Sequence, residues 1–184
     1  MPDLLELPHT PGCIVCGTEN PLGLKMSLFV DPATGIVHVD FSPEDRHIGF
    51  QGIVHGGVIG TIIDEAMVWA ATWNGKRFCV CGEFTVRFRR AAQIGEPLHL
   101  EARVEFARPK FVQTMATIRT PAGSVVATGE GKYVPMALEE SQKVMRTFVE
   151  DEKTKESASL LRGETHPSGG GSGGGAATTG KTPA

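Results

Sequence analysis

The feature that most constrains the fold is a long apolar segment near the middle of the chain, residues 56–73. Apolar side chains recur there at the spacing of one helix face, namely Ile59, Ile62, Ile63, Ala66, Met67 and Ala70. A helix of this length makes about five turns and is roughly 27 Å long. Val58, Val68, Trp69 and Trp73 make its other sides apolar as well. We therefore expect a sheet to wrap this helix or a partner to cover it.

Short alternating runs typical of β-strands lie on both sides of the helix. Residues 24–30 and 36–41 flank the turn sequence Asp31-Pro32-Ala33-Thr34-Gly35, which predicts a hairpin. Four more runs follow the helix, at residues 78–89, 98–107, 112–120 and 124–134, and we predict that they form a meander. The expected class is α+β, an antiparallel sheet around one central helix.

Composition divides the chain into four parts. We expect an N-terminal extension at 1–12, the folded domain at 13–136, a charged and partly helical segment at 137–162, and a flexible Gly/Ser-rich tail at 163–184. The tail has too few large apolar side chains to fold. The segment 137–162 has an amphipathic spacing, and we expect it to pack weakly or to fray.

The charge balance excludes several classes of partner. Lys and Arg number 18 against 21 Asp and Glu, so the net charge of −3 gives no general attraction to nucleic acid or anionic lipid. No apolar run approaches the roughly 18 to 20 residues of a membrane helix, and no secretory leader is visible. We expect a cytoplasmic protein with no nucleic-acid or membrane partner, and four free thiols.

The helix entrance, Val54-His55-Gly56-Gly57, is the first candidate site. Glycine inside a helix costs roughly 1 kcal/mol relative to alanine, so a pair of glycines calls for a reason. The free N–H groups of a first turn, without side chains in the way, can reach an oxygen that carries negative charge. The alternative is a steep turn from strand to helix that needs small residues.

Asp64 is the second candidate, because it lies among Ile62, Ile63, Ala66 and Met67 in the apolar helix. A buried carboxylate is expensive unless it is hydrogen-bonded, paired or in a wet cleft. Burial disfavours its charge and hydrogen-bond donors favour it, and a carboxylate there is a candidate general base. In the alternative reading, Asp64 or Glu65 caps a backbone group or faces solvent.

Helix geometry links the two candidates to oligomerisation. Gly57 and Asp64 are seven residues apart, so they share a stripe but lie about 10 Å apart along the axis. That separation is too large for both to act on one carbonyl. If both are catalytic, they come from different subunits, and we therefore predict a homodimer.

The order of hairpin, long helix and four strands, with His55-Gly56-Gly57 followed by Asp64, resembles the hotdog-fold acyl-CoA thioesterases. The resemblance is to the PaaI-like (phenylacetyl-CoA thioesterase) branch in particular and covers residues 13–135. Three stretches carry it: CIVCGTENPLGLKM, GFQGIVHGGVIGTIIDEAM and CGEFTVRFRRAAQIGEPL.

The resemblance implies a thioester hydrolase with its site at a dimer interface. The Gly57 and Gly56 amides would form the oxyanion hole. Asp64 of the partner subunit would activate water, or attack directly to give a transient anhydride. His55 would orient a group near the thioester, whereas a lone histidine at a helix entrance is otherwise a cap or a surface residue.

Further site residues follow from the same resemblance. Cys81 occupies a position where the family often has Ser or Thr, and a thiol is a poorer hydrogen-bond partner than a hydroxyl. Gln51 is a candidate ligand for the thioester carbonyl or a water. We expect Phe50, Ile63 and Met67 to line the acyl pocket. The cluster of Arg87, Arg89 and Arg90 either meets the phosphates of coenzyme A or forms ion pairs on a solvated face.

The pair Cys13 and Cys16, followed by Gly17, resembles half of a zinc knuckle. A structural zinc site needs four ligands; His9 is near in the sequence, but a fourth ligand is not evident. Cys79 and Cys81 would complete it only if their strand met the N-terminal loop. We therefore expect neither a metal nor an organic cofactor.

Two functions from different classes remain open. One is an acyl-CoA thioesterase, and the other is a non-catalytic acyl-CoA-binding sensor or regulator on the same fold. A hotdog hydratase ranks last, because the chain offers no comparable Asp/His motif. The acyl chain, the carrier (coenzyme A or acyl carrier protein) and the choice between homodimer and homotetramer are not fixed by residue types.

Overall fold

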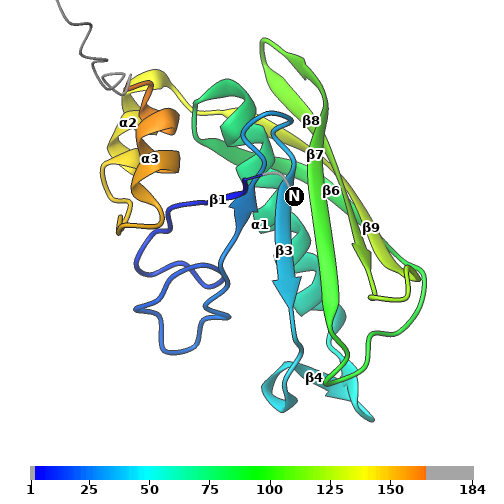
Figure 1. The fold of residues 1–184 in the computed structure, drawn as a ribbon. Helices are drawn as coiled ribbons and strands as arrows, with labels where there is room; N and C mark the ends of the chain where they lie inside the picture. The colour runs from blue at the N-terminus through cyan, green and yellow to red at the C-terminus, as the bar shows by residue number, and fades with distance from the viewer. Residues whose placement is uncertain (1–2, 165–184) are drawn as a thin grey trace, which may run out of the picture.

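In the computed structural model, one long helix, α1 (Gly56–Gly75), packs against a seven-stranded antiparallel sheet (Figure 1). The structure describes residues 3–164. The other elements, in chain order, are β1 (Leu5–Glu6), β2 (Phe29–Val30), β3 (Val37–Phe41), the 3-10 helix η1 (Asp45–His47), β4 (Ile48–Phe50), β5 (Ile53–Val54), β6 (Cys79–Phe88), β7 (Leu98–Arg108), β8 (Phe111–Arg119), β9 (Val125–Pro135), α2 (Leu138–Met145) and α3 (Lys155–Arg162).

The predicted hairpin is confirmed, with a shorter first strand. Phe29 pairs with His38, and the Asp31 N–H donates to the Ile36 carbonyl over 2.9 Å. Residues 24–28 are not in the sheet, because their backbone bonds go to the N-terminal segment. The Leu24 N–H donates to the Ile14 carbonyl (2.8 Å), and the Leu7 N–H donates to the Leu28 carbonyl (2.8 Å).

The four strands after the helix do not form one meander, so that expectation is wrong in part. The sheet order is β1-β2-β3-β7-β8-β9-β6, in which β7, β8 and β9 are a meander and β6 pairs with β9 at the edge. The link from β6 to β7 is too long for a tight turn and makes its own backbone bonds. The Arg89 N–H donates to the Val126 carbonyl, and the Ala92 carbonyl accepts from Val54, so the chain crosses the end of the sheet past the start of α1.

Close packing between α1 and β9 depends on a missing side chain. Ile63 and Met67 are fully buried, and a Cβ on Gly129 would lie 2.4 Å from Ile63 Cγ2 and 3.3 Å from Met67 Cε. Glycine at 129 therefore lets the strand approach the helix. The apolar residues expected on the helix form the centre of the core, which confirms the helical pattern.

The segment 137–162 packs firmly, contrary to expectation. It folds into α2 and α3, which lie beside each other against the N-terminal part of the chain (Figure 1). Phe148, between them, packs its ring 5.5 Å from that of Trp69 and 6.2 Å from that of Phe78. Leu161 is 1% exposed. The segment packs on the aromatic side of α1, which the sheet leaves uncovered. Sequence periodicity alone did not predict this contact.

The predicted α+β hotdog architecture is thus confirmed for the single chain. Residues 1–12, expected as an extension, contribute β1, which pairs with β2. Nearly all of the expected tail, from residue 165 onward, lies outside the described residues. Within residues 3–164, no helix has the length and hydropathy needed to cross a membrane.

Candidate functional site

The helix entrance is fixed by backbone bonds and lies at the surface. The two-stranded ribbon of β4 and β5 leads into α1, and the His55 N–H donates to the His47 carbonyl over 2.9 Å. Gly49 allows this approach, because a Cβ there would lie 3.1 Å from the His55 Cα. His55, Gly56 and Gly57 are all exposed. The positive end of the helix is therefore open to a ligand.

The two glycine amides at this entrance differ in their partners. The Gly57 N–H donates to Nδ1 of His55 over 2.9 Å, so His55 is the N-cap of α1. No protein acceptor lies on the Gly56 N–H within residues 3–164. One amide is thus free, and the other is held by a side chain that can rotate away. The predicted oxyanion role of Gly56 and Gly57 remains a prediction.

A hollow lies on each side of the helix entrance. One, of about 550 Å³, is lined by His55, Gly57 and Val58 together with part of the N-terminal loop, including Ile14, Leu22 and Leu24. The other, of about 370 Å³, is lined by Phe50, Gly56, Ile59, Phe88 and Arg89 among others. Gln51 is exposed on the turn between β4 and β5, with a φ of 49°. The structure therefore brings Phe50, Gly56 and Arg89 together.

The expected arginine cluster separates into paired and unpaired side chains. Arg87 forms an ion pair with Glu130 (2.7 Å), and Arg90 forms a two-pronged one with Glu96 (2.6 and 3.0 Å). The exposed Arg89 has no side-chain partner within residues 3–164. Of the three, Arg89 is the guanidinium available for an anion.

Asp64 lies half-buried at a different place on the helix, where it meets β6 and β9. The Tyr133 Oη donates to Asp64 Oδ1 over 2.7 Å and contacts the Asp64 carbonyl at 3.3 Å. Burial, and then this hydrogen bond, raise the pKa of the Tyr133 phenol, so it stays a donor. Strand β9 thus supplies the Asp64 carboxylate with a fixed partner. Sequence reasoning missed Tyr133, although it is the only tyrosine and strand alternation turns it inward.

Cys81 joins this pair as expected of a site neighbour. It is opposite Tyr133 in the register of β6 and β9, beside an irregularity at Gly82. Burial, and then the negative charge of Asp64, raise the pKa of the Cys81 thiol to about 11. A thiol with a raised pKa is a weak nucleophile at neutral pH, and the place of Cys81 in the site remains a prediction.

Other predicted site residues are placed apart from this cluster. Ile63 and Met67 are fully buried between α1 and β9, and their place in an acyl pocket remains a prediction. Gly57 and Asp64 lie on one helix, seven residues apart, which is about 10 Å. The amides and the carboxylate are therefore too far apart in one chain to act on the same carbonyl, and their shared role remains a prediction.

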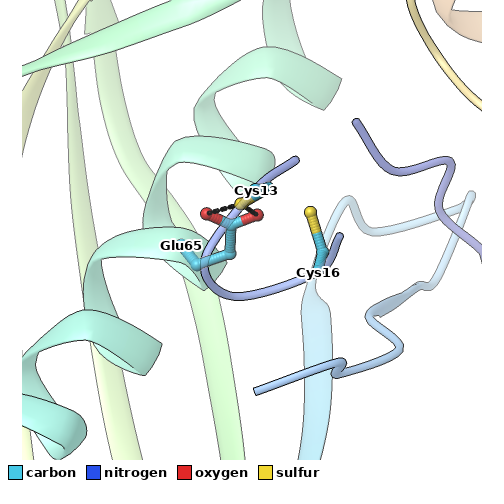
Figure 2. Close-up of side chains that lie close together, drawn as sticks. All are labelled: Cys13, Cys16 and Glu65. Atoms are coloured by element: carbon cyan, nitrogen blue, oxygen red, sulfur yellow. Dashed lines mark hydrogen bonds between the residues drawn. The ribbon is translucent and has the colours of Figure 1, made fainter. Parts of the chain in front are cut away.

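A second cluster forms around Glu65, the residue after Asp64 in α1, and was not predicted from the sequence. Cys13 and Cys16, on the N-terminal loop, face Glu65 of α1 (Figure 2). Cys13 Sγ is 3.7 and 3.8 Å from the two Glu65 carboxylate oxygens, and the Trp69 Nε1–H donates to Oε1 over 3.0 Å. Burial raises the pKa of Glu65 to about 7. The hydrogen bond from Cys16 lowers the pKa of the Cys13 thiol.

The central part of the chain matches a known family. Residues 51–127, which hold the helix entrance, Asp64 and Cys81, match the family model described as "Thioesterase superfamily". An Archaeoglobus fulgidus protein named "Putative esterase" is 25% identical over 97 residues, 53% of this chain and 62% of that protein. The superfamily resemblance inferred from the sequence is thus confirmed at this level.

Solved structures give the same fold. A crystal structure of a thioesterase superfamily protein is 27% identical, with a TM-score of 0.63, and the match covers 67% of this chain and 60% of that one. The Escherichia coli PaaI protein from the phenylacetic acid degradation operon is 21% identical, with a TM-score of 0.54 and coverage of 56% and 75%. A Streptococcus mutans protein bound to acetyl-CoA is 18% identical, with a TM-score of 0.54 and coverage of 57% and 84%.

These matches fix the fold and leave the finer branch open. The chain spans about three fifths of the length of the archaeal relative and of the 27%-identical structure. The likenesses to the PaaI protein and to the acetyl-CoA complex, both under 25% identity, concern the fold alone.

Proposed function

We propose that this hotdog-fold protein of the thioesterase superfamily hydrolyses acyl-CoA thioesters to the free acid and coenzyme A. The observation that carries the proposal is the Asp64 carboxylate, half-buried on an apolar helix and held by Tyr133 at 2.7 Å. A carboxylate fixed in this way, combined with the exposed glycine amides of a second copy of the chain, would supply the parts that acyl transfer to water needs.

In the proposed reaction, Asp64 takes a proton from water as the water oxygen attacks the thioester carbonyl carbon. The carbonyl oxygen becomes negative and accepts from the Gly56 N–H, and from the Gly57 N–H once His55 turns away. The intermediate then collapses, the C–S bond breaks, and the sulfur takes the proton held by Asp64 and leaves as the coenzyme A thiol. In the variant mechanism, Asp64 attacks the carbonyl itself, the C–S bond breaks, and coenzyme A leaves as the thiolate. Water then hydrolyses the resulting anhydride, which frees the acid and the Asp64 carboxylate, and the proton released neutralises the thiolate.

Joint action of the glycine amides and Asp64 requires a second copy of the chain. Strand β6 is an edge strand whose helix-facing side carries the exposed Phe84 and Phe88, an apolar row that a soluble edge normally avoids. Asp64 lies against the inner side of this strand through Cys81 and Tyr133. Association of two chains through β6 would cover the row and bring Asp64 near the glycine amides of the partner subunit.

The choice of coenzyme A as carrier rests on Arg89 and on the fold likeness to an acetyl-CoA complex. Arg89 lines the 370 Å³ hollow next to Gly56, where its guanidinium would meet a phosphate. Phe50 lines the same hollow, and Gln51 follows it on the β4–β5 turn. A medium-chain or aryl acyl group, as in the PaaI-like branch, is the expected substrate class.

Hydrolysis of acetyl-, hexanoyl-, lauroyl- and phenylacetyl-CoA by the purified chain tests the proposal. Loss of thioester absorbance is the readout, because thiol reagents would also titrate the cysteines of the protein. Asp64→Asn should lower kcat/KM by about a hundredfold or more. The matched control is Asp40→Asn, on the outer face of β3, which should leave turnover unchanged. Turnover that survives in Asp64→Asn would refute the assignment of Asp64.

A non-catalytic acyl-CoA sensor is the second candidate, and two observations favour it. His55 occupies the Gly57 amide, and Cys81 replaces the hydroxyl expected beside Asp64. Calorimetric titration with hexanoyl-CoA separates the two functions. Saturable binding with no turnover of any of the four thioesters would establish the sensor, whereas turnover that depends on Asp64 excludes it.

A further inference from the structure

We propose that Cys13, Cys16 and Glu65 bind one thiophilic divalent cation, with Zn²⁺ as the best fit. The three side chains come from the N-terminal loop and from α1 and converge on one point (Figure 2). Their ligand atoms all lie within 4.8 Å of one another. None of the groups used in the proposed hydrolysis belongs to this set.

The loop that carries the two cysteines folds into a tight turn. Cys13 Sγ accepts the Val15 N–H at 3.3 Å, and the Gly17 N–H donates to the Cys13 carbonyl at 3.1 Å. A Cβ on Gly17 would lie 2.5 Å from backbone atoms of Cys13 and of Pro11, so only glycine fits. The tight turn holds both sulfurs on one side before any ion arrives, which reduces the ordering cost of binding.

Glu65 supplies the third ligand at a suitable separation. Tetrahedral zinc, with Zn–S near 2.3 Å and Zn–O near 2.0–2.2 Å, places neighbouring ligand atoms roughly 3.4–3.8 Å apart. The observed distances from Cys13 Sγ to the carboxylate oxygens are 3.7 and 3.8 Å. The Trp69 Nε1–H, 3.0 Å from Oε1, orients the carboxylate in the way that outer hydrogen bonds orient metal ligands.

The donor set selects the class of ion. Two thiolates favour zinc over magnesium or calcium, which prefer oxygen-only sites. Three protein ligands leave a fourth position for water. Binding exchanges the two thiol protons, and any proton on Glu65, for the cation, and these protons pass to the buffer.

Occupancy would fix one wall of a cavity. Cys13 and Cys16 flank Ile14, which lines the 550 Å³ hollow at the helix entrance together with Leu22 and Leu24 of the same loop. The ion would tie this loop to α1. The wall would then be held by metal–ligand bonds in addition to hydrogen bonds such as that from Leu24 to the Ile14 carbonyl.

Cobalt substitution tests the site on the whole, reduced and chelator-treated chain. Co²⁺ should give a sulfur-to-cobalt charge-transfer band that saturates at one equivalent per chain and disappears when Zn²⁺ is added. This band also separates the site from His38, His99 and Glu101, a second group of donors that contains no sulfur. Titration of wild-type protein without any such band would overturn the proposal, whatever the variants do.

Three substitutions define the ligands. Cys13→Ser and Cys16→Ser should each weaken Zn²⁺ binding by about a hundredfold or more, above the 10- to 100-fold typical of lost outer hydrogen bonds. Glu65→Gln keeps an acceptor for Trp69 and should weaken binding while the cobalt band persists. The control, Cys81→Ser, should bind Zn²⁺ as the wild type does. Unchanged affinity in either Cys13→Ser or Cys16→Ser would contradict the assignment.

Hydrogen exchange gives a readout that does not depend on catalysis. Zn²⁺ should slow amide exchange in residues 13–24 of the wild type and have no such effect in Cys13→Ser. The metal site would be overturned by two results together: a Cys13–Cys16 disulfide in the protein purified without reductant, and amide exchange that does not change when Zn²⁺ is added. These results would instead identify a redox pair.

Discussion

Replacing Tyr133 by phenylalanine removes one hydroxyl from the centre of the candidate site and leaves its ring in place. Tyr133 is fully buried, and its Oη lies 2.7 Å from Asp64 Oδ1. A hydrogen bond to a charged group contributes about 1.5–3 kcal/mol. At a loss of about 2 kcal/mol, Tm should fall by roughly 4–8 °C for a chain of this size. Urea unfolding at one fixed protein concentration measures the free energy, because association also affects it.

Two comparisons isolate the Tyr133–Asp64 bond. In an Asp64→Asn background the acceptor is neutral, so the same substitution should cost only about 0.5–1.5 kcal/mol. Thr114→Val, at an equally buried position on β8, removes a neutral bond of 3.3 Å to the Gly131 carbonyl and should cost about 1 kcal/mol. An equal cost of Tyr133→Phe in both backgrounds, or a cost below about 0.5 kcal/mol in the wild type, would refute the charged bond.

Three further substitutions or treatments follow from the packing and the thiol chemistry. Gly129→Ala should lower the free energy of unfolding in urea by about 1–3 kcal/mol, because its Cβ would lie 2.4 Å from Ile63 Cγ2. The control Gly60→Ala has open space around its Cβ and should raise the free energy of unfolding by up to about 1 kcal/mol. Equal effects of the two substitutions would contradict the packing of Gly129 against α1. His55→Ala should cost about 1 kcal/mol through loss of the cap on Gly57, and unchanged stability would show that the cap is dispensable. Iodoacetamide at pH 8, followed by peptide mass mapping, should label the exposed Cys81 roughly a hundredfold more slowly than free cysteine, because its pKa is raised to about 11. Labelling should accelerate as the pH rises toward that value, and also in Asp64→Asn, which removes a charge that disfavours the thiolate; labelling of the wild type at the rate of free cysteine would refute the raised pKa.

Periodicity predicted the parts of the fold whose signals are local. The apolar repeat over residues 56–73 marks α1, and the turn at Asp31 to Gly35 marks the β2–β3 hairpin. The position of β6 at the far edge was not predictable in this way, because it depends on bonds between the loop after Arg89 and segments distant in sequence. The packing of Phe148 on Trp69 was not predictable for the same reason, because the two residues are distant in sequence.

Parts of the candidate site were predictable where a residue type is unusual for its position in the helix. A carboxylate at position 64 in an apolar helix and paired glycines at its entrance are such residues, and both lie where the sequence placed them. Their partners were not predictable, because they are ordinary residues until the strands are paired. Tyr133 meets Asp64 only because β9 lies next to β6 in the sheet.

The adjacent acids Asp64 and Glu65 show why the sequence alone could not separate the two clusters. Consecutive helix positions differ by about 100° around the axis, so one acid turns toward Tyr133 and Cys81 and the other toward Cys13 and Cys16. Their charges still interact, and that of Asp64 adds to the raised pKa of Glu65, after the larger effects of burial and Cys13. A divalent cation bound at Glu65 would displace the two thiol protons and any proton on Glu65, so the net charge of the cluster would stay the same or become more negative. Loading the chain with Zn²⁺ should therefore not speed labelling of Cys81, whereas Asp64→Asn should, because only the substitution removes a negative charge that disfavours the Cys81 thiolate.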